Sequence, residues 1–229
     1  DLNMVSLSKR RKEARLQSYD GRILTARKYN ATIFGMILYG LVANFLICLF
    51  CSNMAATVNS VAFFLTYLVC VIVGCIMSAV STNPVAGFVG YNLIVLPSGF
   101  VISVAVQEYG GLDSEVVTEA FLAATLIIAT MTFFAVLNPQ FCNRLGSLLF
   151  MALMGLIAAE IILLFMGIES SAVSWASAII FSFYISYDVS RSQMYPYTVS
   201  NAVGSAMDIY LDIINLFLSL LEIFGQRSD

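Results

Sequence analysis

Seven apolar runs follow one another along this chain, each close to the ~20 residues that a helix needs to cross a bilayer. The chain is 60% hydrophobic and 11% charged, whereas soluble domains carry about 25% charged residues. Its polar surface is therefore too small to cover its core in water. We predict an all-α integral membrane protein of seven transmembrane helices. The runs are residues 31–51, 58–80, 85–106, 116–137, 145–166, 171–189 and 204–224.

The basic residues are concentrated at the N-terminus, where eight of the eleven Lys and Arg precede Tyr29. We therefore predict that residues 1–30 form a basic cytoplasmic tail and residues 31–229 the transmembrane domain. The C-terminus then lies outside, and Arg144 and Arg191 fall in cytoplasmic loops. An arm that binds anionic lipid is the alternative for the tail; nucleic acid is not expected, because no base-reading motif is present. The short loops favour a bacterial cytoplasmic membrane.

Polar residues mark the last run, where a carboxylate costs roughly 2.5–3.5 kcal/mol at a helix centre. At about 100° per residue, five of them fall on a stripe about 80° wide. The rest of the circumference is apolar, so the stripe should face other helices and the seventh helix should be central in the bundle. The five are Asp208, Asp212, Asn215, Ser219 and Glu222.

Two earlier runs carry the acids that could face this stripe. Asp188 lies near the cytoplasmic end of the sixth run, one turn before Arg191, at a depth that Asp212 can share; Glu160 lies deep in the fifth run. Two close carboxyls should titrate as one unit that holds a proton above the ordinary range. Such a pair suits a proton sensor, or transient binding of Ca²⁺. Alternatively, the protonated acids only hydrogen-bond the helices together.

This chain lacks residues that several classes of enzyme and receptor require. The chain has no histidine, which removes a Ser–His system and the usual zinc site of an intramembrane metalloprotease, and its last lysine is Lys28, which leaves no Schiff-base lysine for retinal in a span. We expect no enzymatic activity and no cofactor.

Two segments resemble a known family. The pair YISYDVS (184–190) and IYLDIINLFLSLLEIFG (209–225) is similar to the C-terminal signature of the Bax inhibitor-1, or transmembrane Bax inhibitor motif, family. The resemblance implies a bundle whose seventh helix is enclosed by the other six. It also implies a pH-sensitive leak with Ca²⁺ as the permeating ion, in which Asp188 and Asp212 act as sensor and gate. Asp208, Asn215, Ser219, Glu222, Glu160 and Arg191 would be pathway or supporting residues.

Two other functions fit the same residues. A proton-coupled secondary transporter would use the acids to carry protons against a substrate, although such proteins favour an inverted repeat, and none is visible. A membrane regulator would instead bind other membrane proteins, such as a protease, and its acids would be structural. The expected partners are the bilayer, Ca²⁺ and protons; the sequence identifies no protein partner.

Overall fold

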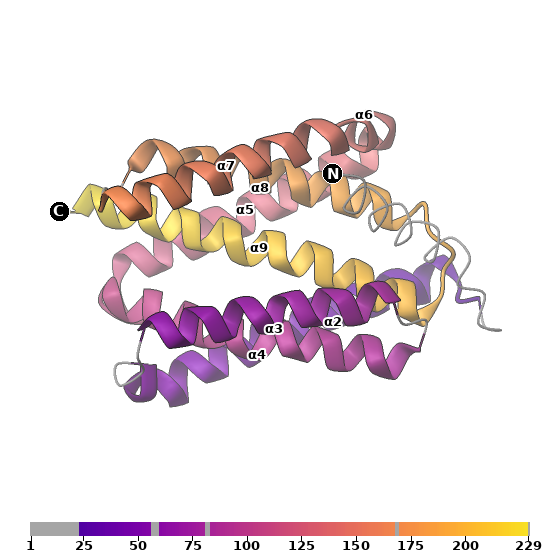
Figure 1. The fold of residues 1–229 in the computed structure, drawn as a ribbon. Helices are drawn as coiled ribbons and strands as arrows, with labels where there is room; N and C mark the ends of the chain where they lie inside the picture. The colour runs from indigo at the N-terminus through magenta and orange to yellow at the C-terminus, as the bar shows by residue number, and fades with distance from the viewer. Residues whose placement is uncertain (1–22, 56–59, 81–82, 168–169, 229) are drawn as a thin grey trace. The chain divides into compact units, whose positions relative to one another are not determined.

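The computed structural model describes residues 23–55, 60–80, 83–167 and 170–228, and every regular element among them is an α-helix (Figure 1). The all-helical prediction is therefore confirmed for the described part of the chain. The helices are α2 (Ala26–Ala55), α3 (Ser60–Val80), α4 (Pro84–Glu108), α5 (Glu115–Leu137), α6 (Pro139–Arg144), α7 (Gly146–Met166), α8 (Ser171–Ser192) and α9 (Val199–Ser228).

Each predicted run coincides with one of the long helices, and the short helix α6 was not predicted. Five helices are long and apolar enough to cross a membrane: α2, α4, α5, α7 and α8. The described apolar stretch of α3 is shorter, residues 66–77. Crossing by all seven long helices therefore stays a prediction.

The last helix begins earlier than expected. Val199 is its first residue, and the Thr198 hydroxyl accepts a hydrogen bond from the backbone N–H of Asn201 at 3.2 Å, as an N-cap residue does. The predicted start of this run, residue 204, was therefore wrong, and Asp208 and Asp212 lie further from the start of the helix than the run implied. The segment missed, residues 199–203, is rich in small and polar residues, which are typical of a loop.

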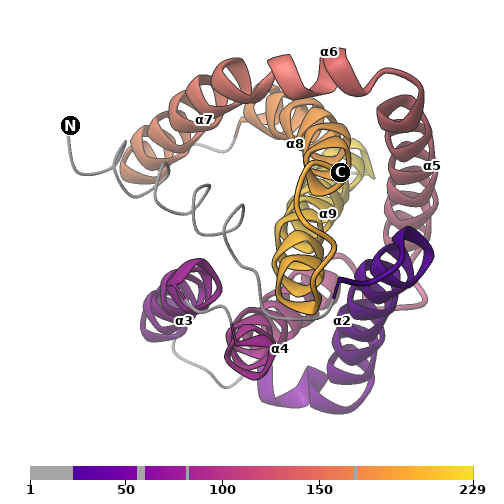
Figure 2. The same ribbon diagram turned by 90° about the vertical axis from the view of Figure 1, so that its right-hand side faces the viewer.

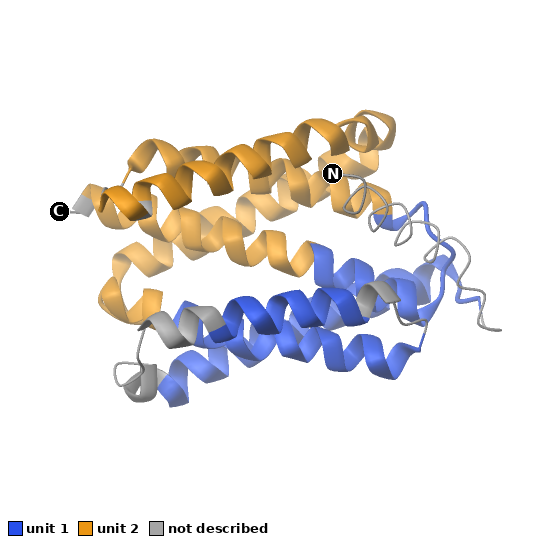
Figure 3. Ribbon diagram, viewed as in Figure 1, with its two compact units in different colours: residues 1–103, 192–208 blue, residues 104–191, 209–229 orange. Residues whose placement is uncertain are grey.

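Contacts divide the chain into two units, coloured in Figure 3. Unit 1 comprises residues 1–103 and 192–208. In it α4 lies between α2 and α3 (Figure 2). The hydroxyl of Tyr91 donates to the carbonyl of Met36 at 2.8 Å. A Cβ at Gly74 would come within 2.6 Å of the Gly90 carbonyl oxygen. Small residues thus let these helices approach closely, as is common in membranes.

Unit 2 comprises residues 104–191 and 209–229. Its helices α8 and α9 run side by side (Figures 1 and 2) and are joined by a hydrogen bond of 2.6 Å between the hydroxyls of Ser177 and Ser219. The ring of Tyr109 packs so tightly on Gly225 of α9 that a Cβ there would overlap it.

Burial extends around the whole circumference of α9. Its apolar residues Leu216 and Leu221 are fully buried, and the polar-stripe residues Asp212 and Ser219 are each only 6% exposed. This is the burial that a central helix requires. The central position itself stays a prediction.

Candidate functional site

The two aspartates of the predicted gate both interact with the phenol of Tyr184. Both carboxyl groups interact electrostatically with this phenol, Asp212 more strongly than Asp188. Asp212 on α9 is buried, and Asp188 on α8 is half-buried. A tyrosine hydroxyl is a donor that a carboxylate can accept. Both acids therefore lie within electrostatic range of one phenol in unit 2.

One face of α8 carries this group. Positions 184, 187, 188 and 191 follow the i, i+3, i+4, i+7 spacing that aligns side chains along a helix. The ring of Tyr187 lies edge-on to that of Tyr184, with centroids 6.3 Å apart and planes at 81°. The guanidinium carbon of Arg191 lies 5.5 Å from the Tyr187 ring centroid, a cation–π contact. A positive charge is therefore held one turn from Asp188 on the same helix.

Neighbouring helices of unit 2 support this face. Tyr187 packs against the start of α7, where a Cβ at Gly146 would come within 2.8 Å of its phenolic oxygen. The hydroxyl of Ser190 donates to the carbonyl of Pro139, at the first residue of α6, at 3.0 Å. The unpredicted helix α6 is thus one of the elements that position the end of α8.

The remaining stripe residues near the predicted outer end bond mainly to their own helix. Asn215 donates its side-chain N–H to the carbonyl of Leu211 at 2.8 Å. Ser219 donates to the carbonyl of Asn215, also at 2.8 Å, in addition to its contact with Ser177 of α8. Hydrogen bonds of this kind to carbonyls of the same helix make a polar stripe more tolerable in an apolar setting.

A second pair of acids lies further along α9. Glu222 and Glu160 of α7 interact electrostatically. Glu222 is half-buried and accepts a hydrogen bond from Gln226 at 3.3 Å, whereas Glu160 is exposed. This pair therefore has more open surroundings than the pair at Tyr184.

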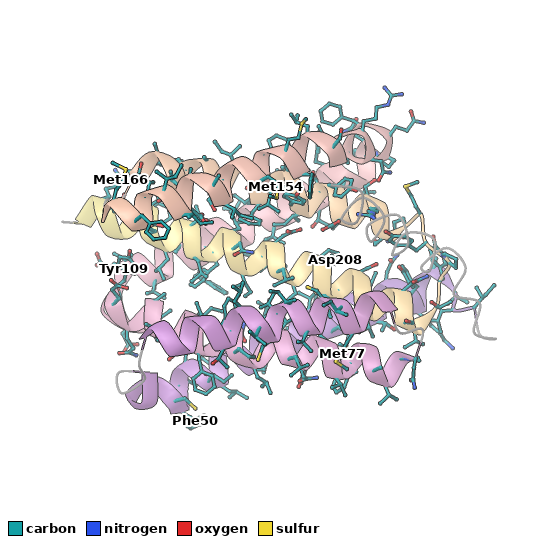
Figure 4. The ribbon with its side chains drawn as sticks, in the orientation of Figure 1. Phe50, Met77, Tyr109, Met154, Met166 and Asp208 are labelled. Atoms are coloured by element: carbon teal, nitrogen blue, oxygen red, sulfur yellow. The ribbon has the colours of Figure 1, made fainter. Side chains whose placement is uncertain are left out.

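Asp208 belongs to unit 1, where it is half-buried on α9 (Figure 4). Asp208 is predicted to lie on the same polar stripe as Asp212, and their spacing of four residues aligns them on one helix face.

Tyr184 and Tyr187 were missed as candidate residues. Their spacing from Asp188, four residues and one residue, is visible in the sequence. On a helical wheel of residues 171–189, this spacing places both tyrosines on the side of Asp188.

Comparisons with known proteins agree with the signature in the last two helices. The sequence profile of the family described as "Inhibitor of apoptosis-promoting Bax1" matches residues 23–229. This match covers all seven of the long helices, not only the two that carry the signature.

Three similar proteins come from bacteria. The chain is 25% identical to the inner membrane protein YbhL of Escherichia coli K12 over 223 residues, which cover 87% of this chain and 92% of that protein. It is 32% identical to an uncharacterized membrane protein of Streptococcus pyogenes serotype M1 over 162 residues, 66% of this chain and 68% of the relative. An uncharacterized protein of Helicobacter pylori J99 is 32% identical, but the match spans about half of each protein, 49%.

Proposed function

Since the chain belongs to the Bax inhibitor-1 family of membrane proteins, we propose that it is a calcium-permeable leak channel whose opening depends on pH. Asp188 and Asp212 are its sensor and gate. The observation that supports the proposal is the electrostatic interaction of both carboxyl groups with the phenol of Tyr184, together with the burial of Asp212. Ca²⁺ is the permeating ion, bound transiently by the two aspartates, and the protein has no resident cofactor and no catalytic activity.

The closed state is held by a single proton between the two aspartates. Two carboxylates that approach each other in a low-dielectric setting cannot both ionise cheaply, so they hold one proton between them. This hydrogen bond ties α8 to α9. A second proton, added on acidification, weakens the tie and lets the helices part. The direction follows the family resemblance, because repulsion between two carboxylates would by itself allow opening at high pH.

Other charged and titratable groups act on this pair. Tyr184 and Tyr187 face it from α8, and Arg191 follows one turn after Asp188. The guanidinium favours the singly ionised pair, since an opposite charge stabilises a carboxylate. Arg191 therefore sets the pH at which the second proton binds.

The polar residues further along α9 form the remainder of the route. Asn215, Ser219 and Glu222 follow Asp212 on one face, and Glu160 of α7 interacts with Glu222. Oxygen ligands of this kind suit Ca²⁺. A permeating ion thus passes from the aspartates to the glutamates along α9.

The proposed orientation follows from the basic tail, with the N-terminus in the cytoplasm and the C-terminus outside a bacterial cytoplasmic membrane. Cysteines introduced at Ser114 and Ser228, in a variant that lacks the native cysteines, should react with an impermeant reagent from the outer side. Labelling of both positions from the cytoplasmic side alone would reverse the assignment.

Calcium flux into proteoliposomes over a range of pH tests the function. The proteins compared are the wild type, Asp188→Asn, Asp212→Asn and the double variant. Each single substitution imitates permanent protonation and should flatten the pH dependence. The double variant should resemble either single one, because the two residues titrate as one unit.

Other outcomes separate the alternatives. Additive effects, with pH dependence kept in each single variant, would place the sensor elsewhere. A flux that requires a second, coupled substrate would indicate a transporter. A folded wild-type protein that passes no Ca²⁺ at any pH would favour a regulator of other membrane proteins.

A further inference from the structure

A tyrosine at the start of α2 joins the two helices that carry the gate aspartates. Tyr29 is fully buried. Its hydroxyl donates to the carbonyl of Ser192, the last residue of α8, at 2.9 Å. The same oxygen lies 3.3 Å from the hydroxyl of Ser205 in α9. A hydroxyl group can donate one hydrogen bond and accept another, so one side chain bridges the end of α8 and the first part of α9.

The bond to Ser192 meets a need of the backbone. The last carbonyls of a helix have no partner within the helix and must find one elsewhere. Ser192 is 2% exposed, so water does not serve its carbonyl freely. The Tyr29 hydroxyl supplies a donor there, and the N–H of Tyr195 a longer bond of 3.4 Å. Loss of the hydroxyl therefore leaves the end of α8 less firmly fixed.

Further contacts bind the start of α2 to the turn between α8 and α9, residues 193–198. The ring of Tyr29 stacks on that of Tyr197, with centroids 4.7 Å apart and planes at 23°. The N–H of Leu24 donates to the carbonyl of Tyr197 at 2.7 Å. The side-chain amide of Gln193 donates to Asn30 at 2.9 Å. All of these residues belong to unit 1, and they hold the turn at three points.

We propose that Tyr29 is a positioning residue for the gate: by bridging Ser192 and Ser205 and stacking on Tyr197, it fixes the turn that joins the helix of Asp188 to the helix of Asp212. The proposal rests on the proposed function, because the aspartates are the gate only if that function holds. Asp188 lies one turn before Ser192 on α8, and Asp212 follows Ser205 on α9. A turn held rigid keeps the two helices at the separation at which their acids share a proton.

Loss of this bridge should favour the open state. Tyr29→Phe keeps the ring and its stacking but removes the hydroxyl. A hydrogen bond of this kind contributes about fivefold to an equilibrium constant. If the closed state loses that factor, the variant should open at less acidic pH. The midpoint of the flux curve should then rise by about 0.7 pH unit for one titrating proton.

The turn itself provides a readout that does not depend on flux. The amide of Tyr195 donates to the carbonyl of Ser192 at 3.4 Å, and the amide of Thr198 donates to the carbonyl of Pro196 at 2.8 Å. In Tyr29→Phe their amide hydrogen exchange should be about fivefold faster, since local opening governs exchange. Tyr39→Phe is the matched control, because it removes another α2 hydroxyl, one that donates to Asn92 at 2.6 Å. It should change neither the exchange of residues 193–198 nor the flux midpoint.

The outcomes separate the two claims. Unchanged exchange in Tyr29→Phe would overturn the clamp, and faster exchange with a wild-type flux midpoint would overturn the positioning role. If the wild type passes no Ca²⁺, the gating role fails with the proposed function, while exchange still decides whether Tyr29 fixes the turn. Should Tyr29→Phe not fold, Tyr197→Leu removes the stacking partner instead and should shift exchange and midpoint in the same directions.

Discussion

Two pairs of acids lie along α9 in unit 2, and their surroundings differ. Asp212 is buried, and both Asp212 and Asp188 interact electrostatically with the phenol of Tyr184. Glu222 is half-buried beside Gln226, and its counterpart Glu160 is exposed. A buried carboxyl is far more sensitive to a neighbouring charge than an exposed one, because solvent screens the latter. A polar stripe in a sequence therefore need not have one role: the pair at Asp212 suits sensing, and the pair at Glu222 suits attraction of cations.

The largest contrast is expected between leucine substitutions in the two pairs. Asp212→Leu should abolish the pH dependence of Ca²⁺ flux, because no shared proton remains. Glu222→Leu should keep that dependence and lower only the rate. Asp212→Leu should also leave thermal stability unchanged or raise it, since apolar replacements of buried ionisable groups are often stabilising.

Flux over a range of pH and thermal unfolding of both purified variants decide this contrast. A wild-type pH profile in Asp212→Leu would show that this aspartate is not the sensor. Loss of pH dependence in Glu222→Leu would show that the second pair takes part in sensing, and the distinction between the pairs would then fail.

A glycine substitution tests whether packing at the far end of α9 matters to the gate. Gly225→Ala should destabilise the protein by about 1–3 kcal/mol, because overpacking against the ring of Tyr109 forces a shift. Gly155→Ala on α7 is the control, since its Cβ would meet nothing within 4 Å; it should gain up to about 1 kcal/mol from helix propensity. Chemical denaturation in detergent measures both. The flux midpoint should stay at the wild-type pH in Gly225→Ala, and a shifted midpoint would couple this end to the sensor.

The corresponding substitution near the aspartates is Gly146→Ala. The added Cβ would come within 2.8 Å of the phenolic oxygen of Tyr187, so the Tyr187 side chain must move. The guanidinium of Arg191 lies over the Tyr187 ring and should move with it. We expect a smaller loss of stability, about 1 kcal/mol relative to Gly155→Ala, because the end of a side chain can yield. The flux midpoint should nevertheless shift. A midpoint equal to that of Gly155→Ala would remove Tyr187 and Arg191 from the sensor.

Much of the fold could be predicted, because apolar length is a strong signal. Each of the seven runs coincides with a helix, and within the described residues the one helix missed is the short α6, since a six-residue helix that begins with a proline shows no clear periodicity. The start of α9 was misplaced because its capping residue, Thr198, and the polar Asn201 that it bonds have no distinctive hydropathy. Helix caps are decided by single hydrogen bonds, which average composition does not show.

Some residues of the candidate site could likewise be predicted from the sequence, and others could not. The aspartates stood out because acids are costly in apolar segments. Tyr184, Tyr187 and Tyr29 did not stand out, because tyrosine is common in membrane proteins and its role depends on where the hydroxyl points. Only the structure shows that the Tyr29 hydroxyl donates a hydrogen bond to the carbonyl of Ser192.

The smallest effect is expected at the hydroxyl pair of Ser177 and Ser219. Ser219→Ala removes their bond of 2.6 Å, and interhelical hydrogen bonds in membranes contribute about 0.6 kcal/mol on average. Ser182→Ala is the control, because that α8 hydroxyl donates to the carbonyl of Ala178 in its own helix at 2.6 Å. Ser219→Ala should therefore unfold at a slightly lower denaturant concentration than Ser182→Ala, with the same flux midpoint as the wild type. If the flux midpoint of Ser219→Ala were displaced as far as that of Gly146→Ala, pH sensing would depend on the contact between α8 and α9 along its whole length. The two acid pairs would then act together as one sensor.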